Sequence, residues 1–226
     1  WKKLVKEGHD LIAAGSPLYQ EYLNGKHIAD SEIPVPKVYE FVEIENRYGY
    51  TMDKLNEMGL LRKCEYQNEF YGDNLQDTDY ACLFYTKNKV LKKVWARHEA
   101  YEKPFKKFCK ENASWLDGYA LYEAIKESFG YTAWNTWPAE YKLRDEKTIK
   151  NFIKEHKDEI ECKKFIQWLF YYQWMNLKEY AAAKGIEIIG DMPIYVAHDS
   201  MDVWCNPSDF LLDEAYNPTL VAGCPP

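Results

Sequence analysis

The chain has 226 residues, of which 46% are hydrophobic and 29% charged, enough for one sizeable core or for one domain with an inserted subdomain. Its net charge of −7 is spread as mixed lysine and glutamate, without the basic patch that nucleic-acid binding requires. It contains no run of about 18 apolar residues and no signal-peptide stretch, and it opens on Trp1, which suggests a piece of a longer protein. We therefore expect a globular cytoplasmic protein that binds neither nucleic acid nor a membrane.

The N-terminal segment, residues 1–52, gives no clear sign of a domain. Leu11–Ile12 and Leu18–Tyr22 suggest short helices, and the prolines of Ile33–Pro36 require an extended backbone. Val38–Ile44 alternates like a strand. We see no chemistry in this segment and leave it unassigned.

Helices are predicted from Asp53 onward, because apolar residues recur there at spacings of three to four. The first helix is short. A longer one is expected to begin with Asp77 or Thr78 as its N-cap and to run toward Tyr101, and Pro104 is expected to kink or break it.

Further helices follow in the second half of the chain. Ser114 can cap one that stops at Gly130, and Trp134–Pro138 is then a loop. Asp145 can cap a polar helix, and the helix after that has a broad apolar face and ends at Gly185.

A short buried strand is predicted at Ile186–Gly190, with Asp191 at its C-terminal end. A helix, a short turn and a strand form the repeating unit of α/β folds, and barrels place their working groups at the C-terminal ends of strands. Many unrelated α/β proteins contain such a unit, so it does not define the fold by itself.

Cysteine and histidine are placed without any metal-binding pattern. There is no CxxC pair and no Cys/His cluster at ligand spacing, so we expect free thiols and neither a metal nor another cofactor. Aromatic residues make up 16% of the chain, and their rings can either fill a core or bind the faces of sugars. The cysteines are Cys64, Cys82, Cys109, Cys162, Cys205 and Cys224.

The stretches Ile188–Ala197 and Asp199–Trp204 resemble the amylomaltases, the 4-α-glucanotransferases of glycoside hydrolase family seventy-seven. Other segments that resemble this family in the same order are Leu116–Tyr122, Ile125–Lys126, Trp134–Pro138, Gln167–Phe170, Asn206–Pro207, Leu212–Asp213 and Val221–Gly223. The resemblance covers residues from about 53 to 226. Residues 1–50 lack the early barrel strand and the aromatic-rich sugar-binding loop that the family pattern leads us to expect.

The resemblance implies an α/β fold, part of a TIM (β/α)₈ barrel of the α-amylase superfamily with a mainly helical inserted subdomain. Residues 53–160 would supply the subdomain. Residues 161–226 would supply a helix–strand unit, with the third barrel strand at about 186–191, and the loop that follows.

The implied activity is the transfer of α-1,4-glucan segments between malto-oligosaccharides with retention of configuration. It needs an Asp nucleophile and a Glu acid/base about 5 Å apart, with a second Asp that steers the sugar. In the family these carboxylates belong to strands later than Pro226. We therefore assign no catalytic residue here and expect the chain alone to be inactive.

Four residues are candidates for binding substrate or organising the site: Asp191, Tyr195, Asp199 and Trp204. We expect Asp191 to organise the sugar site and Asp199 to hold its loop by accepting backbone N–H groups, while Tyr195 and Trp204 could equally pack a loop. His198 receives no role. The alternatives are a helical scaffold or carbohydrate-binding module without catalysis, in which the aromatics are core, and an unrelated barrel enzyme.

Overall fold

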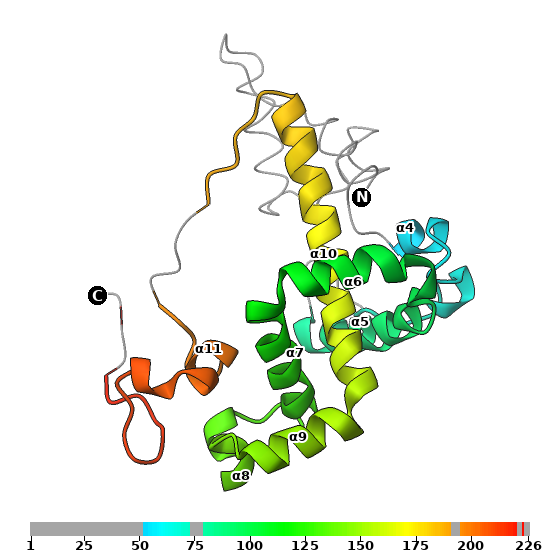
Figure 1. Ribbon diagram of the computed structural model, residues 1–226. Helices are drawn as coiled ribbons and strands as arrows, with labels where there is room; N and C mark the ends of the chain where they lie inside the picture. Colours follow the sequence, from blue (N-terminus) through cyan, green and yellow to red (C-terminus); the bar gives the residue numbers. More distant parts are fainter. Residues whose placement is uncertain (1–51, 73–78, 191–194, 221–222, 224–226) are drawn as a thin grey trace. The chain divides into compact units, whose positions relative to one another are not determined.

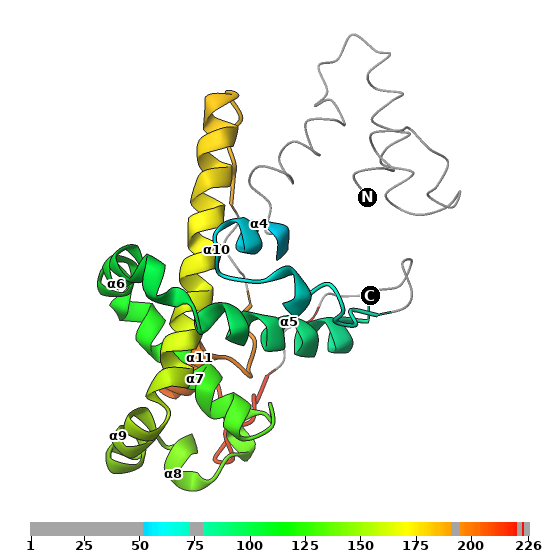
Figure 2. The same cartoon turned by 90° about the vertical axis from the view of Figure 1, so that its right-hand side faces the viewer.

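The computed structural model describes residues 52–72, 79–190, 195–220 and 223, which are mostly helical (Figures 1 and 2). The α-helices are α4 (Met52–Glu57), α5 (Tyr80–Trp95), α6 (Glu102–Glu111), α7 (Ala113–Ser128), α8 (Ala139–Lys142), α9 (Glu146–Glu155), α10 (Lys157–Ala183) and α11 (Met201–Cys205). The 3₁₀ turns are η1 (Lys63–Glu65), η2 (His98–Tyr101), η3 (Trp134–Thr136) and η4 (Pro207–Asp209). Among the described residues, no helix combines the length and the apolar character needed to cross a membrane.

The described residues belong to two compact units. The first holds those up to His98 together with Tyr172–Ile186, and the second holds Glu99–Tyr171 together with those from Glu187 onward. In the first unit, α4, the turn that follows it and α5 supply buried apolar residues. Its buried residues include Leu55, Leu60, Leu61, Val90 and Val94.

The N-terminus of α5 differs slightly from its predicted position. Asp79 is the N-cap, and its carboxylate accepts a hydrogen bond from the Cys82 amide at 2.9 Å. The predicted caps, Asp77 and Thr78, lie outside the described residues. All three residue types can cap a helix, so the choice depends on where the backbone turns, which the sequence pattern does not show.

The C-terminus of α5 was also predicted too late. The helix ends at Trp95 instead of running toward Tyr101, and Pro104 lies in the first turn of a new helix, α6. Proline is tolerated there because a first-turn N–H has no partner within the helix. The break that Pro104 predicts is therefore present, but it comes before the proline.

In the second unit, α7 is the most deeply packed helix. It begins at Ala113 with Asn112 at the N-cap position, not Ser114, because the Asn112 amide also donates to the Phe108 carbonyl at 2.9 Å and ends α6. Gly130 stops the helix as predicted, with φ of +65°. The main core cluster of this unit includes Ala120, Leu121, Tyr122, Ile125, Trp134, Trp137, Phe152 and Trp204.

The polar helix α9 begins where it was predicted, and the long helix α10 ends where it was predicted. Asp145 caps α9 by accepting from the Thr148 amide at 2.9 Å, and Gly185 follows α10 with φ of +72°. Both views show α8 and α9 near the N-terminal end of α10 (Figures 1 and 2). There α10 packs on α6, where the Phe105 and Phe165 ring centroids lie 5.3 Å apart.

The strand predicted at residues 186–190 is not formed. The segment has no regular structure, and Ile189 is 91% exposed. A strand needs a neighbour that accepts and donates its backbone hydrogen bonds, and nothing in the described part of the chain pairs with it. The only β-feature of the described residues is an isolated bridge between Leu212 and Pro218. Asp191 and the strand predicted at 38–44 lie outside those residues.

The cysteines and the acidic groups can be followed where they are described. No group of three or more His, Cys, Asp or Glu in that part of the chain could hold a metal ion. The cysteines that the structure describes are free, namely Cys64, Cys82, Cys109, Cys162 and Cys205.

Candidate functional site

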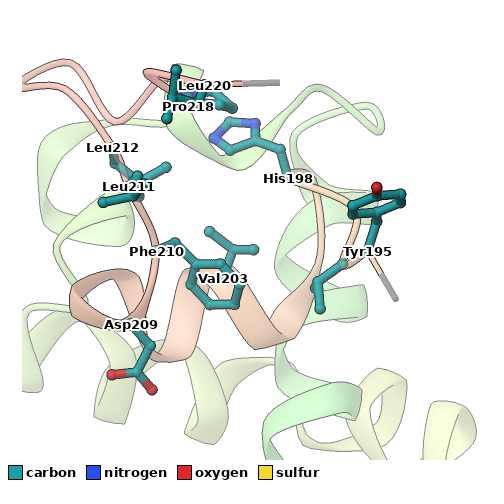
Figure 3. A pocket seen from close by; sticks show the side chains of 10 residues that line it. Tyr195, His198, Val203, Asp209, Phe210, Leu211, Leu212, Pro218 and Leu220 are labelled. Carbon is teal, nitrogen blue, oxygen red and sulfur yellow. The ribbon is translucent and has the colours of Figure 1, made fainter. Parts of the chain in front are cut away.

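A cavity of about 480 Å³ lies in the segment that follows α10 (Figure 3). Its size falls within the range of small-ligand sites. Three stretches form its walls: the chain before α11, one side of α11 with η4, and the chain after η4. The lining residues are Tyr195, Val196, His198, Val203, Asp209, Phe210, Leu211, Leu212, Pro218 and Leu220.

The cavity combines apolar walls with a few polar groups. Figure 3 shows Phe210 and Val203 on one side and His198 opposite them, with Tyr195 at the edge. The Tyr195 side chain is 65% exposed. An accessible ring beside a small number of hydrogen-bonding groups suits a ligand with apolar faces and hydroxyl edges.

Asp199 ties this segment to α7. Its Oδ1 accepts a hydrogen bond from the Tyr122 hydroxyl at 2.7 Å and from the backbone N–H of Trp134 at 3.2 Å, and its Oδ2 forms an ion pair with Lys126. The side chain therefore accepts one backbone N–H, whereas the sequence predicted several from its own loop. That N–H belongs to η3 and not to the residue's own loop. The sequence pattern did not indicate Tyr122 or Lys126 as its partners.

The protonation states of this cluster are set by its surroundings. Burial acts to raise the pKa of Asp199, but the hydrogen bonds from Lys126, Tyr122 and the Trp134 amide outweigh it and leave the pKa below its ordinary value of 3.8. Burial, followed by the hydrogen bond to Asp199, raises the pKa of the Tyr122 hydroxyl. Asp199 is thus a carboxylate at neutral pH, and Tyr122 remains a hydrogen-bond donor.

His198 joins two walls of the cavity. Its Nε2 lies 2.7 Å from the Tyr216 carbonyl, and its own carbonyl accepts from the Trp134 indole at 2.8 Å. Tyr216 has φ of +66°, a left-handed backbone conformation that residues other than glycine rarely adopt. The turn around it is held by Asp213, whose Oδ1 accepts from the amides of Ala215 and Asn217 at 2.9 and 2.8 Å. No motif in the sequence pointed to His198.

Trp204 occupies a different environment from Tyr195. It is 1% exposed, and its indole N–H donates to the Tyr141 carbonyl at 3.1 Å. The Arg144 guanidinium lies over the ring, 5.0 Å from its centroid. The burial of this indole fits the packing of a loop, which is one of the two roles considered for it from the sequence.

Gly118 allows α11 to lie close to α7. A Cβ built at this position would lie 3.5 Å from the Met201 sulfur and 3.7 Å from the Cys205 sulfur. The separation leaves room for one methyl group but not for a larger side chain. This contact fixes the position of α11, and α11 contains Val203, which lines the cavity.

The cavity thus combines an accessible tyrosine and an imidazole with apolar walls. The family model for 4-alpha-glucanotransferase matches residues 33–226, and the chain belongs to that family. The resemblance seen in the sequence is thereby confirmed. The match begins at residue 33, so residues 33–52, which showed no recognisable motif, also fall within it.

Individual relatives agree with the family match. The chain is 43% identical to the 4-alpha-glucanotransferase of Clostridium butyricum over 183 residues, which cover 80% of this chain and 38% of the relative. It is 42% identical to that of Thermus thermophilus over 153 residues, which cover 66% of this chain and 31% of the relative. The chain thus spans about a third of the length of these relatives.

A solved structure is also similar. The amylomaltase from Streptococcus agalactiae in complex with acarbose aligns with a TM-score of 0.70 and 36% identity, over 79% of this chain and 37% of that one. The helical arrangement described above is therefore shared with an amylomaltase.

Proposed function

We propose that this chain is part of a 4-α-glucanotransferase that transfers α-1,4-glucan segments between malto-oligosaccharides. The observation that carries the proposal is the family match over residues 33–226. The cavity in the segment after α10 adds chemical support, because its exposed tyrosine and few polar groups suit a sugar chain.

The proposed mechanism is a retaining double displacement. One carboxylate attacks the anomeric carbon to form a glycosyl-enzyme, and a second carboxyl group protonates the leaving oxygen and then deprotonates the acceptor hydroxyl. We place these groups on barrel strands later in the protein than this stretch. The chain alone is then without the nucleophile and inactive.

Within that enzyme, the stretch would contribute a helical subdomain and part of a TIM barrel. Residues 186–191 would pair as the third barrel strand once their neighbours are present, and Asp191 would organise the sugar site from the end of that strand. Tyr195 would contact the glucan, while Asp199 and Trp204 would hold the segment that carries it. The expected partners are malto-oligosaccharides and longer α-1,4-glucans.

The test uses the complete gene product and the 226-residue chain in parallel. Incubated with maltotriose, the complete protein should release glucose and form longer maltodextrins, whereas the 226-residue chain should form neither. Longer products made by the 226-residue chain, at a rate proportional to protein, would contradict the proposed place of the carboxylates. Binding of maltotriose without transfer by the complete protein would favour the alternative, a carbohydrate-binding module.

A further inference from the structure

Two side chains of α7 hold the cavity segment through one carboxylate. Tyr122 and Lys126 are four residues apart and so lie on one face of the helix. Both contact Asp199, Tyr122 through its hydroxyl at 2.7 Å and Lys126 through its ammonium group. The Lys126 ammonium also lies 5.5 Å from the centroid of the Tyr122 ring.

This cluster is partly shielded from water. The Lys126 side chain is 16% exposed and that of Asp199 35%, while Tyr122 is 2% exposed. An ion pair with this degree of burial is screened less than a surface pair, and breaking it leaves a partly buried charge unpaired. It therefore differs from an exposed pair such as Lys150 with Glu146 on α9, where the side chains are 70% and 84% exposed.

The other charged residues near the cluster do not take the place of Lys126 beside the Asp199 carboxylate. Glu123 and Glu127 of α7 are acidic, so they cannot pair with it. Lys163 of α10 is basic, but it pairs with Glu127 at 2.8 Å. Burial raises the pKa of the Glu123 carboxyl.

Asp199 lies next to the lining of the cavity. It directly follows His198, and Tyr195 and Val196 come shortly before it (Figure 3). The Trp134 indole, which donates to the His198 carbonyl, belongs to the residue whose backbone N–H donates to Asp199. Trp134 is thus bonded both to Asp199 and to the backbone of the lining residue His198.

We infer that Lys126 and Tyr122 are positioning residues for the glucan site, acting through Asp199 on the wall formed by Tyr195 and His198. This inference rests on the proposed function of the cavity. Neither side chain is among the residues that line the cavity. Lys126 and Tyr122 fix the position of the wall formed by Tyr195 and His198. Their loss should therefore weaken substrate binding more than it slows turnover.

The experiment compares four variants of the complete protein. Lys126→Met keeps the aliphatic stem and removes the charge, Lys126→Arg keeps a donor and the charge, and Tyr122→Phe removes only the hydroxyl. Lys150→Met is the matched control, because it removes an exposed ion pair on another helix. The measurements are kcat and KM with maltotriose, and amide hydrogen exchange of residues 195–204.

Lys126→Met should raise KM about 10-fold with kcat changed less than about 2-fold, because the wall moves while the chemistry is unaltered. Exchange of residues 195–204 should become faster. Tyr122→Phe should act in the same direction but less, about 3-fold in KM, because one of several hydrogen bonds is lost. Lys126→Arg should stay within about 3-fold of the wild type, and Lys150→Met should equal it.

Two results overturn the positioning role while leaving the enzyme activity in place. One is unchanged exchange of residues 195–204 in both Lys126→Met and Tyr122→Phe. The other is faster exchange with an unaltered KM, which would make the cluster purely structural. A wild-type protein that makes no longer maltodextrins from maltotriose refutes the proposed function, and this inference with it. If Lys126→Met fails to fold, Tyr122→Phe and Lys126→Arg decide the matter by the same criteria.

Discussion

The helices around α7 and the segment after α10 are held in place by different forces. Leu116, Ala120 and Ile125 of α7 are completely buried, so the packing of apolar side chains stabilises that part of the molecule. From Glu187 to Leu220 most described side chains have some exposure, and a few polar contacts set the path of the chain, chiefly those of Asp199 and His198. Loss of a packed ring should therefore affect folding, whereas loss of a polar contact should affect the cavity.

The largest expected effect on the free energy of unfolding distinguishes the two aromatic candidates, Trp204 and Tyr195. Trp204→Ala should lower the free energy of unfolding by about 3–5 kcal/mol, because a buried indole is removed and a cavity remains. Tyr195→Ala should change it by less than about 0.5 kcal/mol, because the ring is largely exposed. Urea denaturation of both variants measures the difference. Equal losses would show that the Tyr195 ring is packed as tightly as the Trp204 ring.

The contact between α7 and α11 tests how closely the two regions are joined. Gly118→Leu should cost about 1–3 kcal/mol, because the larger side chain would collide with Met201 and Cys205. Gly118→Ala should instead stabilise the protein by about 0.5–1 kcal/mol, since a Cβ fits and alanine favours a helix interior. Thermal unfolding of both variants checks the opposite signs. A destabilising alanine would mean that α11 lies closer to α7 than described.

The N-cap of α5 provides a local comparison away from the cavity. Asp79→Ala should lower the free energy of unfolding by about 1 kcal/mol, because the Cys82 amide loses its acceptor. Asp79→Asn, which can still accept that hydrogen bond, serves as the control. Circular dichroism during urea denaturation measures both, and equal losses would show that charge matters here more than capping.

The smallest expected effect concerns pH and the Asp199 carboxylate. Because the pKa of Asp199 is lower in the folded protein than its ordinary value of 3.8, its contribution to stability is fully present above about pH 4 and is lost as the pH falls through the folded pKa. The wild type should melt higher than Asp199→Asn at pH 7, and the difference should shrink below pH 4.

Melting temperatures of the two proteins from pH 7 to pH 2 test this. A difference that stays constant over the whole range would show that the carboxylate charge does not contribute. A difference that grows as the pH falls would mean that folding raises the pKa of Asp199 instead of lowering it.

Many local features followed from the sequence alone. The stops at Gly130 and Gly185 and the cap at Asp145 were predicted correctly, because a left-handed backbone after a helix and a carboxylate before one are properties of a few neighbouring residues. The motifs from Ile188 to Trp204 also indicated the family, which the match over residues 33–226 confirms.

The tertiary structure decided which candidate side chains are accessible and what holds them. Asp199 meets Tyr122, Lys126 and Trp134, which are 77, 73 and 65 residues away in the sequence. Trp204 is buried and Tyr195 exposed, although both are aromatic residues of one motif. Residues 186–190, apolar like a buried strand, have no pairing partner among the described residues. Periodicity and caps are determined within one or two turns of chain, whereas pairing, burial and the partners of a charge depend on which distant surfaces meet.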